Sequence, residues 1–307
     1  MKEELIQINK EKKENKNENE NKKYWVWFTL IEGLGIKRKE ILLDKYKEPK
    51  NIYNKTKEEL MKIEGIGEKI AENIVSIETK NKIEKHIRYI EENNIDIVTI
   101  KDKEYPEGLK NIYDPPIVLY VKGNKEILNN KQTKIAIVGC RKATEYGLKT
   151  ARYFAYNLAN KKDIIIVSGL AKGIDSISHI GSIEAKGKTI AVIGNGLDSV
   201  YPKENSKLYE EIIKNEGTII TEYPLGTKPN KMNFPARNRI ISGLSKGIIV
   251  VEAKEKSGTL ITVDFALEQG REVYVIPGNI NSKNSVGTNR LIKEGAKVVT
   301  SFEDIIE

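Results

Sequence analysis

Seven short apolar segments, rich in valine and isoleucine, recur along the second half of the chain and alternate with stretches of helical periodicity. The segments are IAIVG at 135, DIIIVSG at 163, TIAVIG at 189, TIITEY at 218, GIIVVEA at 247, EVYVIPG at 272 and AKVVTS at 296. The intervening helices are predicted to begin near Glu145, Asp175, Asn205, Ala236, Thr259 and Thr288. Strands that alternate with helices pair mostly in parallel, through right-handed crossovers. The pattern therefore predicts an α/β domain, with a mostly parallel sheet and helices on both faces.

The turn after the first segment is the first candidate binding site. IAIVG ends at Gly139, and the basic residues Arg141 and Lys142 follow. Thr144 is predicted to cap a helix that runs from about Glu145 past Leu158. Free backbone N–H groups and the helix dipole favour an anion in such a turn.

A second glycine-containing loop, SGLAKGID, follows the second strand and runs from Ser168 to Asp175. Gly169 and Gly173 allow a close backbone approach, Lys172 adds positive charge, and Asp175 is expected to cap the next helix. Neither this loop nor the first turn has the G-x-G-x-x-G spacing of a dinucleotide site. We therefore expect no NAD and no other cofactor.

Two further stretches place polar groups at predicted helix starts. FPARNRIISGLS carries Arg237 and Arg239, and guanidinium groups suit bidentate contact with phosphate. Residues two apart on a helix face different ways, so one arginine is alternatively structural, holding a carboxylate such as Glu222 or Glu252. In KSGTLITVDFALEQG, Ser257, Gly258 and Thr259 suit either an anion contact or a helix cap.

The first 130 residues fall into three parts. Residues 1–23 are mostly Lys, Glu and Asn and are expected to form a disordered tail. Residues 24–98 have helical periodicity, and their passages LIEGLGIKRKEIL and KIEGIGEKIAENI repeat after 32 residues, from Gly33 to Gly65. The second passage resembles the helix-hairpin-helix motif, in which Gly65, Gly67 and Lys69 would contact phosphate, although a plain helical hairpin also explains it. Residues 99–130 are read as a connector whose strand, IVLYVKG, leans on the edge of the main sheet.

Charge and composition narrow the function classes. Residues 131–307 hold 26 Lys+Arg and 19 Asp+Glu, net +7, whereas residues 1–130 hold 26 and 25, net +1. This excess suggests nucleic acid as a partner. The chain has no apolar run of membrane-spanning length and no signal sequence, which predicts a cytoplasmic protein without membrane contact. With one cysteine and two histidines, no metal site is expected, and His179 is read as a packed histidine rather than a base.

Six motifs in a fixed order carry a family resemblance. GCRKATEYG, SGLAKGIDSISH, TIAVIGNGLDSVYP, FPARNRIISGLS, VVEAKEKSGTLIT and GREVYVIPG resemble the DNA-processing protein A family (DprA, also called Smf) over roughly residues 100–300. The resemblance implies an extended Rossmann-like domain that binds single-stranded DNA, dimerises and loads the RecA recombinase during natural transformation, without catalysing a reaction. Many relatives continue into a C-terminal winged-helix-like domain, whereas this sequence stops at Glu307 without one.

The resemblance also implies a DNA pocket. Matched by motif, it would use Gly139, Cys140 and Arg141, then Lys172, and then Arg237 and Arg239. Serine or threonine is commoner at the position of Cys140, so a hydroxyl contact to phosphate is in doubt there. Ser168, Gly169, Asn238, Ser257 and Gly258 complete the DNA-binding candidates. Tyr146 and Phe234 are candidates for base stacking, with burial in the core as the alternative.

An enzyme is the rival interpretation. The sheet architecture resembles that of the lysine-decarboxylase-like phosphoribohydrolases, whose P-G-G-x-G-T-x-x-E motif would place its catalytic glutamate at Thr262. A threonine does not supply that carboxylate, so the sequence argues against the enzyme. The segment between Leu260 and Ile276 is the expected dimer surface. Whether RecA is contacted, whether the helical region binds DNA, and whether the role is competence, recombination or defence are open at this point.

Overall fold

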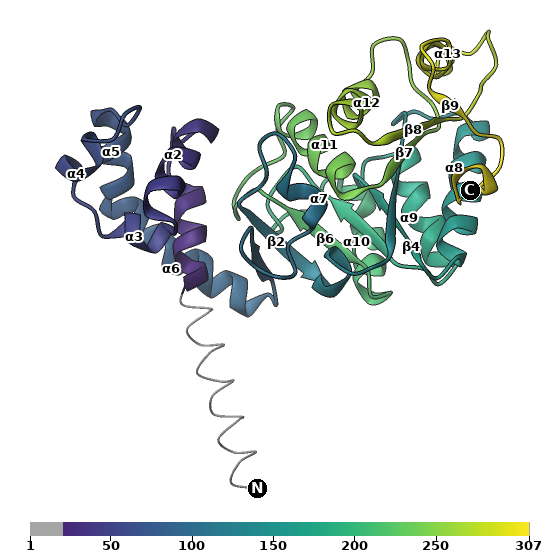
Figure 1. The fold of residues 1–307 in the computed structure, drawn as a ribbon. Coiled ribbons are helices and arrows are strands. Elements are labelled where there is room, and N and C mark those ends of the chain that lie inside the picture. Colours follow the sequence, from purple (N-terminus) through teal and green to yellow (C-terminus); the bar gives the residue numbers. More distant parts are fainter. Residues whose placement is uncertain (1–20, 307) are drawn as a thin grey trace, which may run out of the picture. The chain divides into compact units, whose positions relative to one another are not determined.

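A computed structural model describes residues 21–306 and divides the chain into two compact units, with the boundary between Thr99 and Ile100 (Figure 1). Most of the tail predicted at 1–23 lies outside the described residues. Residues 21–23 are helical, however, because they belong to a helix over 21–30 whose Trp27 and Phe28 are buried. The tail prediction is therefore wrong for its last three residues.

The first unit is helical, as the periodicity predicted. After the helix over 21–30 come α2 (Ile36–Tyr46), α3 (Pro49–Tyr53), α4 (Lys57–Met61), α5 (Glu68–Val75) and α6 (Ile77–Glu92), with the short strand β1 (Asp96–Thr99) at its end. Its core includes the fully buried Trp27, Leu42, Ile52 and Leu60. Thr56 and Glu59 form a reciprocal capping box that fixes the start of α4.

The two repeated glycine passages form matching turns within this unit. Gly33 and Gly65 have φ values of 74° and 82°, in the left-handed region that favours glycine. Arg38 joins the turns, because its Nε donates to the carbonyl of Gly65 at 2.9 Å and its Nη1 to that of Gly33 at 3.4 Å. The repeat thus produces two hairpins tied together by one guanidinium.

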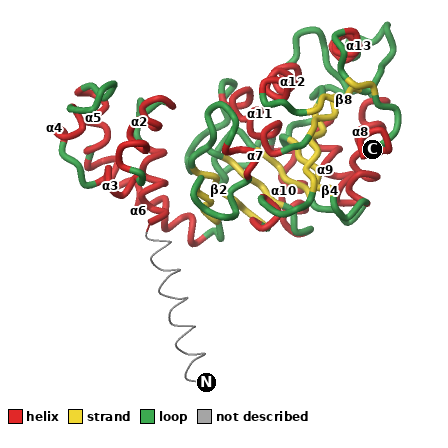
Figure 2. The backbone as a smooth tube through the Cα atoms, viewed as in Figure 1, coloured by secondary structure: helices red, strands yellow, loops and turns green. Residues whose placement is uncertain are grey.

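The second unit is built on a sheet of mostly parallel strands (Figure 2). Its strands are β2 (Val118–Gly123), β3 (Thr133–Val138), β4 (Ile164–Ser168), β5 (Thr189–Val192), β6 (Thr218–Thr221), β7 (Gly247–Val250), β8 (Glu272–Val275) and β9 (Lys297–Val298). In space they run β2-β6-β5-β4-β3-β7-β8-β9. All seven strands predicted after residue 131 are present. The strand predicted in the connector is β2, which pairs antiparallel with β6, with Tyr120 opposite Thr221.

Helices cover both faces of this sheet, as predicted for an α/β domain. They are α7 (Glu107–Lys110), α8 (Glu145–Asn160), α9 (Ile174–Glu184), α10 (Ser206–Lys214), α11 (Asn233–Leu244), α12 (Gly258–Glu268), α13 (Val286–Lys293) and α14 (Glu303–Ile306), with 3-10 turns η1 (Lys125–Leu128) and η2 (Lys203–Asn205). Phe154 and Leu158 of α8 bury against Ile135 and Ile137 of β3. The alternate side chains of the central strands face α11, which contacts β3, β4 and β5. Among residues 21–306, no helix is long and apolar enough to cross a membrane.

The carboxyl ends of β3 and β7 lie side by side, since Val138 is in register with Val250. Just after β3 the backbone passes close to Ile174 of α9, since a Cβ on Gly139 would lie 2.6 Å from Cγ1 of Ile174. Thr144 caps α8 as predicted, because its Oγ1 accepts from the N–H of Gly147 at 3.1 Å. Ligands of doubly wound sheets bind at this kind of edge.

Candidate functional site

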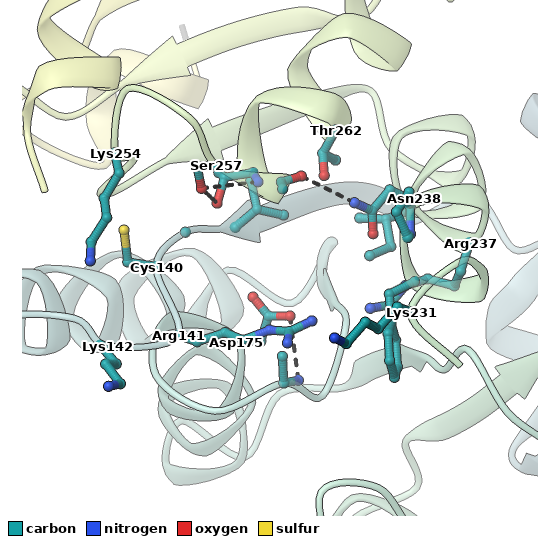
Figure 3. A pocket seen from close by; sticks show the side chains of 18 of the residues that line it. Cys140, Arg141, Lys142, Asp175, Lys231, Arg237, Asn238, Lys254, Ser257 and Thr262 are labelled. Carbon is teal, nitrogen blue, oxygen red and sulfur yellow. Dashed lines mark hydrogen bonds between the residues drawn. The ribbon is translucent and has the colours of Figure 1, made fainter. Parts of the chain in front are cut away.

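A hollow of about 560 Å³ opens at the carboxyl ends of β3 and β7, and we call it the main hollow (Figure 3). Three segments supply most of its lining: the β3–α8 turn, the first turns of α11, and the loop and helix start between β7 and α12. Six cationic side chains line it, namely Arg141, Lys142, Lys231, Arg237, Lys254 and Lys256. Asp175 is the one carboxylate among the lining residues within the described chain. The hollow therefore suits an anionic ligand.

A buried carboxylate fixes the turn that carries Arg141 and Lys142. Glu252, just beyond β7, accepts hydrogen bonds from the backbone N–H of Thr144 at 3.0 Å, from the Thr144 hydroxyl, and from Asn284 Nδ2 at 3.1 Å. Asn284 also donates to the carbonyl of Lys142 at 2.9 Å. The alternative in which Glu252 holds an arginine is wrong, because its oxygens hold this turn instead. A preorganised turn presents its cations at a lower entropic cost of binding.

An aromatic pair lies beside Arg141. The Arg141 guanidinium carbon is 5.4 Å from the centroid of the Phe234 ring, and Phe234 stacks on Tyr201 with centroids 5.4 Å apart and ring planes at 27°. Phe234 was a predicted stacking residue, and the structure places it in the lining of the main hollow. Tyr201 was missed, although it is the last residue but one of the motif TIAVIGNGLDSVYP. Together the two rings and Arg141 form a surface suited to a flat aromatic ligand.

Arg237 forms part of the floor of the main hollow and is only 4% exposed. Its Nη1 donates to the carbonyl of Gly169 at 2.8 Å. Burial lowers the pKa of Arg237 to about 10, while the charge of Asp175 acts in the opposite direction, so this arginine is charged at neutral pH. Burial also raises the pKa of Asp175, and Arg237 partly offsets that effect.

Gly169 makes this buried pair sterically feasible. A Cβ at Gly169 would lie 2.6 Å from Oδ2 of Asp175 and 2.7 Å from Nη1 of Arg237. Gly169 therefore does not line the main hollow. Its carbonyl accepts the hydrogen bond from Arg237. The prediction that Asp175 caps α9 is wrong, because Gly173 holds the N-cap position and Asp175 lies in the first turn of the helix. Its Oδ2 instead accepts from the N–H of Ala171 at 3.4 Å.

Arg239 does not line the main hollow. It is 5% exposed and binds Glu222 with two nitrogens, one of them at 2.6 Å, and Asp114 at 3.2 Å. Burial alone would lower the pKa of Arg239, but the hydrogen bonds and charge of Glu222 raise it above its usual value. The alternative of one structural arginine paired with Glu222 is confirmed. The expectation that Arg239 contacts DNA directly finds no support in this geometry.

The start of α12 completes the main hollow. Ser257 caps the helix by accepting from the N–H of Thr259 at 3.2 Å, and Asn238 donates from Nδ2 to the carbonyl of Gly258 at 3.3 Å. Asn238 thereby joins α11 to α12. Ser257, Gly258 and Thr259 all face the hollow, so both alternatives for this segment, a helix cap and a place beside an anion site, agree with the structure.

Besides Gly169 and Arg239, three further predicted DNA-binding or stacking residues lie outside the main hollow. Lys172 is exposed and pairs with Glu204 at 2.5 Å. The buried hydroxyl of Ser168 donates to the carbonyl of Ile137 at 2.7 Å. Tyr146 lies on the other side of the β3–α8 turn, where its hydroxyl donates to the carbonyl of Pro277 at 2.9 Å. From the sequence, these residues were expected near the ends of the strands. Their side chains point away from the main hollow.

Cys140, His179 and Thr262 are the residues to consider for a catalytic role. Cys140 lines the main hollow but is buried, and burial raises the pKa of its thiol. His179 is a packed histidine, as predicted. Its Nδ1 donates to the Thr189 hydroxyl at 2.7 Å, and burial lowers its pKa to about 3. Thr262 faces the main hollow at the position where the rival enzyme would need a glutamate.

The candidate phosphate contact in the helical unit, made of Gly65, Gly67 and Lys69, is surrounded by carboxylates, unlike the main hollow. Gly67 is the N-cap of α5 and provides no side-chain cap. Glu68 begins the helix, and Lys57 pairs with both Glu68 at 2.8 Å and Glu72 at 2.6 Å. Gly65 and Lys69 are exposed beside these carboxylates. Within residues 21–306, no group of three His, Cys, Asp or Glu side chains is arranged to hold a metal ion.

Two sequence models of known protein families match this chain. The sequence model described as DNA recombination-mediator protein A matches residues 96–307, and that described as a SAM-like helix-hairpin-helix tandem matches residues 28–77. The DNA processing protein DprA of Bacillus subtilis is 47% identical over 226 residues, which cover 74% of this chain and 75% of that protein.

Two solved structures are also similar. The X-ray structure of DNA processing protein A from Streptococcus pneumoniae superposes with a TM-score of 0.81 at 37% identity, covering 92% of this chain and 96% of that one. A structure of DNA processing protein A from Helicobacter pylori, which concerns that protein's single-stranded DNA binding mode, has a TM-score of 0.62 at 32% identity. It covers 69% of this chain and 94% of that one.

Proposed function

Because the chain belongs to the DNA recombination-mediator protein A family, we propose that it binds single-stranded DNA in the main hollow and acts as a recombination mediator. The observation that carries the proposal is the convergence of six cationic side chains on a hollow that also holds a stacked aromatic pair. Cations that track phosphates and rings that accept any base bind a single strand without reading its sequence.

Different residues of the main hollow are proposed to contact the phosphates and the bases of the strand. Arg141 and the exposed lysines of the rim contact phosphates, while Arg237 supplies a fixed charge from the floor. The start of α12 offers backbone N–H groups to one phosphate. A base stacks at the edge of Phe234 and Tyr201. Lys172 joins from outside the hollow, because its exposed ion pair with Glu204 is weak enough to exchange for a phosphate.

The family supports a wider proposal. We extend the proposal to loading of RecA onto the bound strand, to action in the cytoplasm and to a function without catalysis. The segment from Leu260 to Ile276 is the proposed homodimer surface, and Leu267 in it is an exposed large apolar side chain. The absence of a carboxylate at Thr262 counts against the phosphoribohydrolase alternative.

Fluorescence anisotropy of a labelled oligo-dT strand, titrated over a range of salt concentrations, tests the proposal. The protein is expected to prefer the single strand to a duplex of equal length, with affinity falling as salt rises. Arg141→Ala should weaken binding about tenfold and reduce the salt slope by about 1, because one phosphate contact is lost.

Lys246→Ala is the matched control, since it removes one positive charge from an exposed residue just before β7, at the opposite end of the strand from the hollow. It should leave both affinity and salt slope near those of the wild type. Equal loss in the two variants would mean that net charge, rather than the main hollow, binds the strand. Absence of binding by the wild-type protein would refute the proposed function.

A further inference from the structure

A second hollow, of about 320 Å³, lies beside α8 and outside the main hollow; we call it the tyrosine hollow. Its walls come from α8 and from the segments that follow β8 and β9: Tyr146, Lys149, Thr150, Tyr153, Phe154, Ile276, Pro277, Val299 and Thr300. The residues after β8 and β9 are again at the carboxyl ends of parallel strands. The tyrosine hollow is therefore on the same edge of the sheet as the main hollow.

Two exposed rings define the tyrosine hollow. Tyr146 is 52% exposed and Tyr153 is 44% exposed, and they lie seven residues apart, which places them on one side of α8. The Tyr146 hydroxyl is held by the carbonyl of Pro277 at 2.9 Å. Tyr153 packs edge-on against Phe154, with ring centroids 5.4 Å apart, and against Phe302 at 6.3 Å. Both rings are thus held in place with much of their surface open to solvent.

A third hollow, of about 550 Å³, lies next to the tyrosine hollow; we call it the bridging hollow. It shares Tyr146 and Pro277 with the tyrosine hollow, and it contains Thr144. The β3–α8 turn therefore lines all three hollows in sequence order, from Arg141 and Lys142 through Thr144 to Tyr146. A strand that leaves the main hollow beside Lys142 and follows this turn would reach Tyr146.

The charges along this path suit a phosphodiester backbone. Lys149 lies between the two tyrosines, and its one-turn pair with Glu145 at 2.7 Å is exposed, so its ammonium can exchange partners. Glu252 is the one carboxylate among the described residues that line the bridging and tyrosine hollows. Its oxygens are buried in the bonds to Thr144 and Asn284, and they hold the path's shape.

We propose that Tyr146, Lys149 and Tyr153 form a second subsite for the same DNA strand, which accepts bases beyond those in the main hollow. This inference rests on the proposed function. Seven residues of helix rise about 10 Å, so the two rings stack on different bases rather than on the two faces of one base. Lys149 contacts the phosphates between those bases. The strand thus binds along the sheet edge from the ends of β3 and β7 to those of β8 and β9.

The test compares a short with a long oligo-dT. A strand of about 5 nucleotides fills the main hollow, and one of about 15 reaches the tyrosine hollow, within the range of site sizes known for single-strand binding grooves. The variant Tyr146→Ala/Tyr153→Ala should bind the long strand about tenfold more weakly and the short strand as the wild type does. The unchanged short-strand affinity also shows that the variant is folded.

Two controls isolate stacking. Tyr153→Phe keeps the ring and should retain long-strand affinity. Tyr156→Ala removes another exposed tyrosine from α8 that lines neither hollow, and it should have no effect. In Tyr153→Trp, the added fluorescence should be quenched by the long strand and not by the short one.

The failures are distinguishable. If the wild type binds both lengths equally and the tyrosine variants match it, the second subsite is refuted, while binding to the main hollow stands through the effect of Arg141→Ala. If the variants change self-association in sedimentation but not DNA affinity, the tyrosines form a protein contact and the inference is wrong. If the wild type binds neither length, the proposed function itself fails.

Discussion

The glycine turn before α5 and the glycine turn before α8 begin alike, with a backbone bend leading into a helix N-terminus. At α5 the neighbours are carboxylates, since Glu68 opens the helix and shares Lys57 with Glu72. At α8 the turn faces cations that arrive from α11 and from the β7–α12 loop. The comparison teaches that a helix start alone does not make an anion site. The site that we propose has, in addition, like-charged side chains that converge from separate elements.

The two regions also differ in how they keep their charges. In the helical unit, the Lys57 pairs are on the surface, where solvent screens them. In the sheet unit, Arg239 is enclosed with Glu222 behind the main hollow, and Arg237 and Asp175 are buried in its floor. Buried charges are costly to leave unpaired, so their partners matter for the fold as well as for binding.

The largest effect should come from Arg239→Ala. It leaves Glu222 enclosed without its main partner, which is expected to lower the free energy of unfolding by about 3–5 kcal/mol. Urea denaturation followed by far-ultraviolet circular dichroism measures the change. Lys57→Ala, which also breaks two ion pairs, should cause a far smaller change because those pairs are exposed.

A replacement of both partners sharpens this result. Arg239→Met combined with Glu222→Leu should recover part of the lost stability, since no charge is then left buried alone. Equal destabilisation by Arg239→Ala and Lys57→Ala would contradict the distinction between the two regions.

A smaller effect is expected from pH. Burial raises the pKa of Asp175 above its ordinary value, so Asp175 gains a proton as pH falls through that raised value. Neutralising it makes the floor more positive, and DNA should bind a few-fold more tightly as the pH is lowered from 7 through that raised value. In the helical unit, the hydrogen bond and charge of Lys57 lower the pKa of Glu68, which therefore stays ionised over this range.

Anisotropy titrations at constant ionic strength, with Asp175→Asn alongside the wild type, check the pH prediction. The variant lacks the titrating carboxyl and should bind with an affinity that changes little over the same range. His179 does not contribute, because its pKa of about 3 keeps it neutral. An undiminished pH dependence in Asp175→Asn would assign the effect to another group.

The smallest effect is expected from Lys69→Ala. The helix-hairpin-helix resemblance makes Gly65, Gly67 and Lys69 a candidate phosphate contact, but Glu68 and Glu72 lie beside it. We expect less than about a twofold change in affinity for single-stranded or duplex DNA, since nearby carboxylates repel phosphate. A tenfold loss, measured in the same titrations, would make the hairpin a DNA site and remove the contrast on which this comparison rests.

Local patterns in the sequence were enough to predict the fold. Runs of β-branched residues marked the seven strands, and the Thr144 cap was evident from the residue type that precedes a helical stretch. The spacing of Arg237 and Arg239 also led to the right alternative, because residues two apart on a helix face different ways. Each of these inferences depends on periodicity over a few neighbouring residues.

The site depended on information that periodicity does not carry. Lys231, Lys254 and Lys256 come from loops, where no repeating pattern says which way a side chain points. Tyr201 meets Phe234 across 33 residues of chain, so neither position alone indicates the stack. For the same reason Lys172, which looked equivalent to the lining lysines, pairs with Glu204 outside the hollow.

The antiparallel pairing of β2 with β6 has a consequence for how the protein is made. Tyr120 and its partner Thr221 are 101 residues apart, and ribosomes add about 5–20 residues each second. For roughly 5–20 seconds the nascent chain therefore carries VLYV, an apolar strand, without the strand that will cover its backbone. Unpaired strands of this kind are templates for aggregation. The speed of translation between Tyr120 and Thr221, and the access of chaperones during that time, therefore affect how much of the chain aggregates before it folds.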